Sequence, residues 1–232
     1  IEMLKGKHNL HSFHLAGIVP IADQPRDFNF PWHDALQPVA QNFLALENAV
    51  LECAMAGCET IWVVCHDTAQ SLIRHRLGDW IEDPVSIRRM DKFSSQTRRQ
   101  IPIYYVPIHP KDRDKRDCLG WSALYGALSA YYISKKISKW IIPDRYYVSF
   151  PYGIFDLSLI RAARKNISNN NNFYLSYNNR TIRDGDYLSF TFSGEDFIRF
   201  RREMKKQATT IYTKGTKEKL PISERYSARY FL

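Results

Sequence analysis

The first pattern along the chain is an apolar run of strand length at residues 13–22, followed by a polar, proline-marked loop at 23–40. Apolar residues then recur at helical spacing over about 42–56, and a second apolar run covers 60–65. This order predicts a βαβ unit with an unusually long first connection. Because ligands of open parallel sheets bind outside the carboxyl ends of the strands, we expect the loop at 23–40 to border the functional site.

The predicted helix at 42–56 has one apolar stripe at helical spacing. The stripe comprises Phe43, Leu46, Val50, Cys53 and Ala54. Gly57 is predicted to end this helix, because glycine readily adopts the left-handed conformation of a helix terminus. Glu47 and Glu52 lie off the stripe, and we expect both to face solvent.

Further alternating units follow. A helix opened by Asp67 or Thr68 and ended by Gly78 completes a second βα unit, with Leu72, Ile73 and Leu77 on its apolar face. The next apolar run, at 101–108, contains Pro102 and Pro107, which predicts an edge strand or a bulged strand.

The second half of the chain continues this alternation. Residues 119–132 form a predicted helix with a wide apolar face, in which Gly126 permits a close approach to the sheet. Residues 139–144 are predicted to form a short buried strand that ends in Asp144, with a further strand segment at 146–150. Asp156 is predicted to cap a helix that runs to about residue 165.

A polar asparagine run at 169–172 separates this α/β region, residues 1–168, from a C-terminal region, residues 169–232. Apolar runs at 173–177 and 187–192 predict an antiparallel pair joined through the Asp184-Gly185 turn signal, followed by a basic helix to about residue 207. We expect this region to pack on the same domain. The predicted fold is therefore a three-layer α/β protein with a mostly parallel central sheet and a C-terminal β pair and helix.

Composition narrows the class of protein. The 232 residues are 44% hydrophobic, without the run of about eighteen apolar residues that a membrane span needs. The first eight residues lack the features of a signal peptide. Cysteines stand at 53, 58, 65 and 118 without a C-x-x-C pair, which indicates buried reduced thiols. Together these features predict a cytoplasmic protein.

The net charge of +9 has two interpretations, a footprint for phosphates or other polyanions and an ordinary solvated surface. The basic residues at 111–117 alternate with acidic ones, which is typical of a self-neutralising loop. The clusters at 88–99 and 199–219 are the better candidates for polyanion contacts.

Four segments together resemble a known family. Residues 30–40, Phe-Pro-Trp-His-Asp-Ala-Leu-Gln-Pro-Val-Ala, resemble the F-P-K-x-L-x-P-V segment of sugar-nucleotide pyrophosphorylases, which have the nucleotide-diphospho-sugar transferase (GT-A) fold. Residues 56–64 are similar to that family's A-G-x-x-x-I-x-V-V segment, and residues 119–128 to its G-T-A-x-A-L helix start. Residues 140–144 stand where the family has a strand that ends in a metal-binding aspartate. The resemblance covers about residues 13–165.

The resemblance implies a protein that binds a nucleotide or a nucleotide sugar together with Mg²⁺ or Mn²⁺, and that catalyses nucleotidyl or glycosyl transfer. It implies roles for nine residues of this chain. They are Asp144 as metal ligand, Asp23 and Arg26 in the phosphate loop, His33 and Asp34 as a base or ligand pair or as residues that fix the loop, and His66, Asp67, Gly120 and Ser122 beside the base or ribose.

The sequence departs from the family at the first loop. The glycines whose backbone amides hold phosphates in the family are absent from residues 20–27, and Gly17 alone precedes them. An alternative is therefore a catalytically inactive module of the same fold with a binding or assembly role. A further alternative is a basic nucleic-acid-binding protein. The chain also resembles uncharacterised proteins of tailed bacteriophages, which implies a transferase acting on phage DNA.

Overall fold

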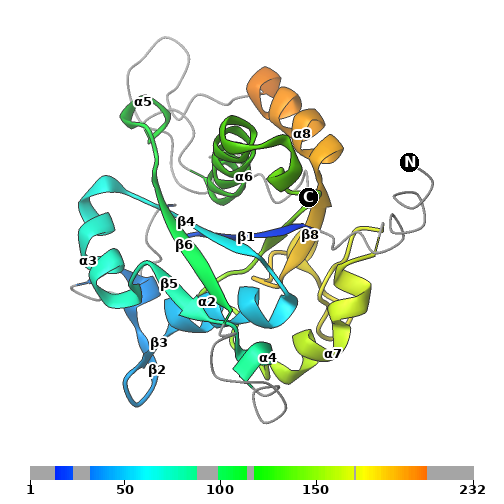
Figure 1. Ribbon diagram of the computed structural model, residues 1–232. Coiled ribbons are helices and arrows are strands. Elements are labelled where there is room, and N and C mark those ends of the chain that lie inside the picture. The colour runs from blue at the N-terminus through cyan, green and yellow to red at the C-terminus, as the bar shows by residue number, and fades with distance from the viewer. Residues whose placement is uncertain (1–13, 23–31, 88–98, 114–117, 170, 208–232) are drawn as a thin grey trace.

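The computed structural model describes residues 14–22, 32–87, 99–113, 118–169 and 171–207 (Figure 1). Its central feature is a six-stranded sheet in the order β5-β6-β4-β1-β7-β8. The strands are β1 (Leu15–Pro20), β4 (Thr60–Cys65), β5 (Trp80–Glu82), β6 (Gln100–Pro107), β7 (Arg145–Val148) and β8 (Phe190–Ser193). The four central strands β6, β4, β1 and β7 are parallel, while β5 and β8 are antiparallel to their neighbours. The predicted α/β class with a mostly parallel sheet is confirmed.

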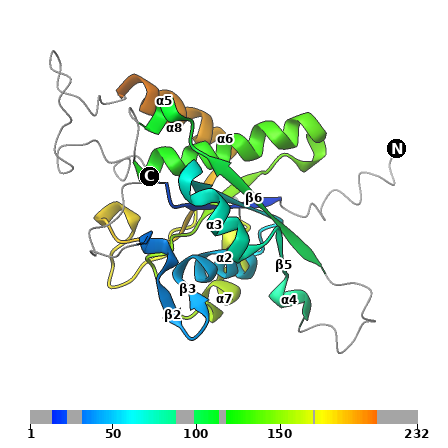
Figure 2. The same ribbon diagram turned by 90° about the vertical axis from the view of Figure 1, so that its left-hand side faces the viewer.

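Helices cover both faces of the sheet (Figures 1 and 2). One face packs against α6 (Leu119–Ile137) and α8 (Gly194–Gln207), and the other against α2 (Ala45–Ala56), α3 (Asp67–Leu77) and α7 (Ser158–Ile167). The shorter helical elements are η2 (Asp34–Leu36), α4 (Pro84–Ile87), α5 (Pro110–Arg113), η5 (Lys139–Ile141) and η6 (Ile182–Asp184). Strands β2 (Pro38–Ala40) and β3 (Phe43–Leu44) form a separate antiparallel pair before α2. Among the described residues, no helix is both long enough and apolar enough to cross a bilayer.

Two glycines allow helices to lie close to the sheet. A Cβ atom on Gly17 of β1 would lie 2.8 Å from the Sγ of Cys53 in α2, on one face. A Cβ on Gly126 of α6 would lie 2.7 Å from a methyl carbon of Ile18 and also of Val64, on the other face. Real Cβ atoms do not approach other atoms so closely, so a larger residue at either position would push a helix off the sheet. The predicted close approach at Gly126 is confirmed.

Several local signals give the element boundaries directly. Gly57 ends α2 in the left-handed conformation, with φ 98°, and Gly78 follows α3 with φ 75°. Leu157 is the N-cap residue of α7, and the predicted cap Asp156 lies one position earlier, where it accepts the backbone amide of Ser158 at 2.9 Å. In the C-terminal region, Tyr174 and Phe190 form an antiparallel bridge, and β8 continues the main sheet beside β7. The β pair predicted there is confirmed.

Other predictions of local structure are wrong. Residues 139–144 contain the 3-10 turn η5 and no strand, and β7 begins at Arg145. Strand β6 is not an edge strand, because the short strand β5 pairs with it at Pro102. Leu72 is predicted on the apolar face of α3 but is 56% exposed, whereas its neighbour Ile73 is buried. The part of α3 that packs against the sheet is therefore narrower than its set of apolar residues.

The prediction that Glu52 faces solvent is also wrong. Its carboxylate is fully buried beneath α2 and accepts three hydroxyl hydrogen bonds. Tyr147 in β7 donates at 2.6 Å, Ser149 just after β7 donates at 2.8 Å, and Ser189 just before β8 donates a further short bond. Burial disfavours the charged form and raises the pKa of Glu52 to about 7, although the three donors act in the opposite direction.

We predict that Glu52→Gln removes a pH dependence of stability. An unfolded glutamate titrates near 4.5 and the folded one near 7, so the folded chain binds this proton more tightly. The free energy of unfolding of the wild type therefore falls as pH rises through this interval, by about 3 kcal/mol relative to Glu52→Gln. Urea denaturation at pH values from 5 to 8 would measure this difference.

Tyr147→Phe is the matched control, because it removes one hydroxyl donor but keeps the buried carboxyl group. Its stability should still fall as pH rises. Parallel pH profiles for the wild type and Glu52→Gln would contradict the prediction.

Candidate functional site

The candidate site lies at the edge of the sheet where β1, β4, β6 and β7 end, here called the carboxyl edge. Along the chain the parallel strands proceed from β1 to β4 to β6, and then return to the other side of β1 as β7. The strand order thus reverses between β1 and β7. Ligands of open α/β sheets bind at such a reversal, outside the carboxyl ends of the strands.

His33 is fixed against the end of β1 just before η2. Its Nδ1 accepts the backbone amide of Ala35 at 3.2 Å, so the ring proton lies on Nε2, which is 3.2 Å from the carbonyl oxygen of Ile21. Burial is the largest influence and lowers the pKa of His33. The ring is therefore neutral, and both of its nitrogens hold the η2 turn against β1.

Asp34 is the first residue of η2, and the residue is only 4% exposed. Its Oδ2 atom is buried without a hydrogen-bond partner among the residues that the structure describes. A buried carboxylate oxygen without a hydrogen-bond partner costs free energy, and a bound ligand, ion or water molecule is one of the explanations for such an atom. A ligand at this edge could therefore donate the hydrogen bond that the Oδ2 atom of Asp34 lacks among the described residues.

The first turn of α6 lies against the same end of β1. Ser122 is fully buried and donates its hydroxyl to the carbonyl oxygen of Ala22 at 2.6 Å. Gly120 is also buried, two residues before Ser122 in the same turn. The hydroxyl of Ser122 thus joins α6 to the strand end, and its donor hydrogen faces Ala22 instead of a base or ribose.

His66 and Asp67 follow β4 and open α3, as predicted from the sequence. His66 lies near enough to His33 to contribute to the lowering of the pKa of His33. Asp67 is exposed, and its Oδ1 accepts the backbone amide of Thr68 at 2.8 Å. The structure therefore brings His33, Asp34 and His66 together at the carboxyl edge, with Ser122 bonded to the same strand end.

A cavity of about 860 Å³ lies beyond the carboxyl end of β7, between residues 152–155 and 175–188. Its walls are rich in aromatic and aliphatic side chains, namely Tyr152, Phe155, Tyr177, Tyr187, Leu159 and Leu175. Arg180 and Asp186 form a two-point ion pair in this wall, with N–O distances of 3.0 Å. The sequence prediction did not include this cavity. Its aromatic residues come from two segments whose contact no local pattern indicates.

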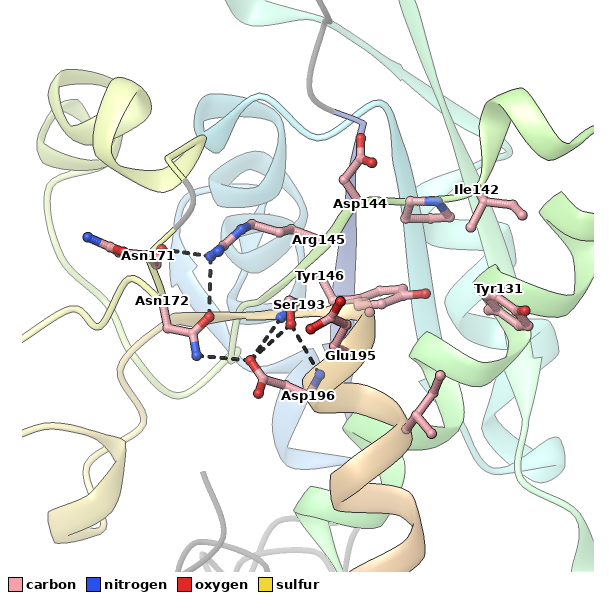
Figure 3. Close-up of a pocket in the computed structure, with 13 residues that line it drawn as sticks. Tyr131, Ile142, Asp144, Arg145, Tyr146, Asn171, Asn172, Ser193, Glu195 and Asp196 are labelled. Atoms are coloured by element: carbon pink, nitrogen blue, oxygen red, sulfur yellow. Dashed lines mark hydrogen bonds between the residues drawn. The ribbon is translucent and has the colours of Figure 1, made fainter.

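Asp144 lies at the opposite edge of the sheet, where the parallel strands begin (Figure 3). It precedes β7, its backbone amide donates to the carbonyl of His14, and its Oδ2 accepts the backbone amide of His14 at 2.9 Å. The prediction that Asp144 ends a strand is wrong, because Pro143 cannot donate a ladder hydrogen bond and the strand starts after it. The residue that follows β7 at the carboxyl edge is Ser149.

Two further predicted residues, Asp23 and Arg26, fall outside the described residues. Within the described part of the chain, no group of three or more His, Cys, Asp or Glu side chains is arranged to hold a metal ion. The residues described at the carboxyl edge therefore do not fit a metal site by themselves.

Comparisons with known proteins give likenesses in structure only. No family model matches the chain, and no curated protein matches it. The inositol-1-phosphate CTP transferase from T. maritima is 9% identical with a TM-score of 0.46, covering 94% of this chain and 79% of its own. Rv0371c from Mycobacterium tuberculosis H37Rv is 12% identical with a TM-score of 0.48, covering 80% of this chain and 74% of its own. The functional proposal for this chain must accordingly rest on its own residues.

We predict that Ser122→Ala lowers the free energy of unfolding by about 1–2 kcal/mol, because the buried carbonyl of Ala22 loses its hydroxyl donor. Ser129→Ala on the same helix is the matched control. Its hydroxyl is part-buried and bonds to the carbonyl of Tyr125 one turn earlier, so its loss should cost less than about 0.5 kcal/mol. Urea denaturation of both variants measures the two effects, and equal losses would contradict the role given to Ser122.

Proposed function

We propose that the chain binds a nucleotide or a nucleotide sugar at the carboxyl edge and catalyses nucleotidyl or glycosyl transfer. The observation that carries this proposal is the buried Oδ2 atom of Asp34, which has no hydrogen-bond partner among the described residues and lies beside His33 and His66, where β1 and β4 end. Ribose hydroxyls and exocyclic amino groups of bases are hydrogen-bond donors of the kind that a buried carboxylate accepts. The order of the family-like segments around this edge gives further support.

In this proposal each residue has a separate task. His33 is neutral and holds η2 in place, so it positions Asp34 without transferring a proton itself. Asp34 accepts hydrogen bonds from the nucleoside, and His66 lines the same edge from the end of β4. The aromatic cavity beyond β7 holds the sugar or the acceptor, because sugar rings stack on exposed tyrosines such as Tyr177.

Dependence on Mg²⁺ or Mn²⁺ stays a prediction from the family resemblance. Within the described residues, neither Asp34 nor Asp67 belongs to a group of three or more side chains that could hold a metal ion. Asp144, the predicted metal ligand, lies at the other edge of the sheet. No step of the proposed transfer is therefore assigned to a metal ion.

The test is a thermal-shift panel of nucleoside triphosphates and sugar nucleotides, each with and without Mn²⁺. A bound ligand at about 100 times its dissociation constant adds about 2.7 kcal/mol to stability, which raises Tm by about 5–10 °C for a chain of this size. We expect one nucleotide class to give such a shift. Asp34→Asn, which keeps the shape of the side chain, should reduce it.

Asp144→Asn is the matched control for this experiment, because its carboxylate lies at the opposite edge. It should leave the nucleotide-induced shift unchanged. A shift that survives Asp34→Asn but disappears in Asp144→Asn would overturn the proposed site and restore Asp144 as the ligand residue. The absence of any nucleotide response from a folded protein would sink the proposal as a whole.

A second candidate is a catalytically inactive module that binds the same ligands or serves assembly. The residue that follows β7 favours this candidate. In the family that the sequence resembles, an aspartate stands at the end of this strand, whereas here the residue is Ser149, whose hydroxyl donates to Glu52. Nucleotide binding without turnover of any sugar nucleotide, in the presence of Mn²⁺, would support this candidate over the transferase.

A nucleic-acid acceptor, including modified phage DNA, is a further proposal that rests on charge. Helix α8 carries Arg199, Arg201 and Arg202 in its described part, within a chain of net charge +9. Contacts between arginine side chains and DNA phosphates release counterions, so the affinity for DNA should fall steeply as the salt concentration rises. If Arg199→Gln/Arg202→Gln leaves both the affinity and the salt slope unchanged, this helix does not bind the acceptor.

A further inference from the structure

A second large cavity lies at the edge where the parallel strands begin, here called the amino edge (Figure 3). Its volume is about 880 Å³. The start of β7, the end of β8, the first turn of α8 and Tyr131 of α6 form its walls. None of the residues proposed to bind the nucleotide lines it.

The charged side chains around this cavity are mainly acidic. Three carboxylates, of Asp144, Glu195 and Asp196, line it together with one guanidinium, that of Arg145. Arg145 turns toward Asn171 and donates to its carbonyl oxygen at 2.7 Å (Figure 3). This acidic lining stands out in a chain with 33 basic and 24 acidic residues.

The three carboxylates are not equally available to a ligand. Asp196 is engaged in capping α8 through Ser193 and in an ion pair with Arg199 at 2.9 Å. Asp144 and Glu195 are both exposed, and within the described part of the chain neither has an ion-pair partner. These two groups are therefore the ones that a cation entering the cavity would meet.

The hydroxyl of Tyr146 gives an independent sign of a missing partner. The side chain is completely buried and lines the cavity, yet its oxygen has no hydrogen-bond partner among the described residues. In Figure 3 this hydroxyl points toward Tyr131, on the same side as Ile142. This part of the cavity wall is apolar and aromatic, and its polar atom is the Tyr146 hydroxyl, which has no hydrogen-bond partner among the described residues.

We propose that the amino edge binds a small organic cation, an alkylamine or alkylguanidine. Its charged head lies between Asp144 and Glu195, and its aliphatic stem packs on Tyr131 and Ile142. A second N–H group at the far end of the stem donates to the oxygen of Tyr146. An organic cation fits better than a metal ion, because no metal-binding group of side chains occurs within the described residues.

The experiment is isothermal titration of the full chain with putrescine and with agmatine at low ionic strength, with 1,4-butanediol as the uncharged probe of similar length. We expect both cations to bind and the diol not to bind. Asp144→Asn and Glu195→Gln should each weaken binding up to about fivefold, as expected for one exposed charge pair. Asp67→Asn, an exposed carboxylate at the carboxyl edge, should leave it unchanged.

Tyr146→Phe separates a binding role from a structural one. The hydroxyl has no hydrogen-bond partner among the described residues, so its removal should leave Tm unchanged or raise it. The same variant should bind putrescine about threefold or more weakly, because a ligand hydrogen bond is worth roughly 1 kcal/mol. A purely structural hydroxyl would change Tm without changing the affinity.

Three results would each overturn the proposal. The first is failure of both cations to bind below about 10 mM, a threshold that corresponds to a very weak site. The second is equal affinity of the wild type, Asp144→Asn and Glu195→Gln for the cations. The third is binding of Mn²⁺ in place of the amines, if that binding is lost in Asp144→Asn. Because these titrations contain no nucleotide, their outcome is independent of the proposed carboxyl-edge function.

Discussion

The interaction on which the architecture depends is the burial of the Glu52 carboxylate under α2. Three hydroxyl donors converge on it from β7, from the residue after β7 and from the residue before β8. These partners lie 95 to 137 positions away along the chain. A carboxylate removed from water without such donors would be strongly destabilising. The network therefore ties α2 to β7 and to the segment before β8.

The same network fixes the walls of the aromatic cavity. Ser149 lies three residues before the segment 152–155, which forms one wall of the cavity. Ser189 directly follows the segment 175–188, which forms the other wall. Close packing of the segments adds to this constraint, since a Cβ on Gly153 would lie 2.3 Å from the carbonyl oxygen of Tyr187. The separation of the two walls is thus set by one carboxylate and one close backbone contact, and the pKa near 7 of Glu52 makes that constraint sensitive to protonation.

Local patterns predicted those parts of the fold that local physics decides. Gly57 and Gly78 end helices because their backbones take conformations that few other residues adopt, and the strand at 60–65 is an uninterrupted buried run. The burial of Glu52 was not predictable in this way, because its partners are far away in sequence. The interior position of β6 depends on the short strand β5, which periodicity cannot reveal in three residues.

The candidate site shows the same division. His33, Asp34 and His66 come from loops whose positions follow from strand order alone, so topology was enough to bring them together. The family-like segment at 140–144 predicts a strand that ends at Asp144, whereas Pro143 delays the start of the strand until Arg145. The register of β7 then puts Ser149, committed to Glu52, at the point nearest the carboxyl edge. The buried carboxylate that η2 supplies at that edge is Asp34, whereas Asp144 belongs to the separate acidic cavity at the amino edge.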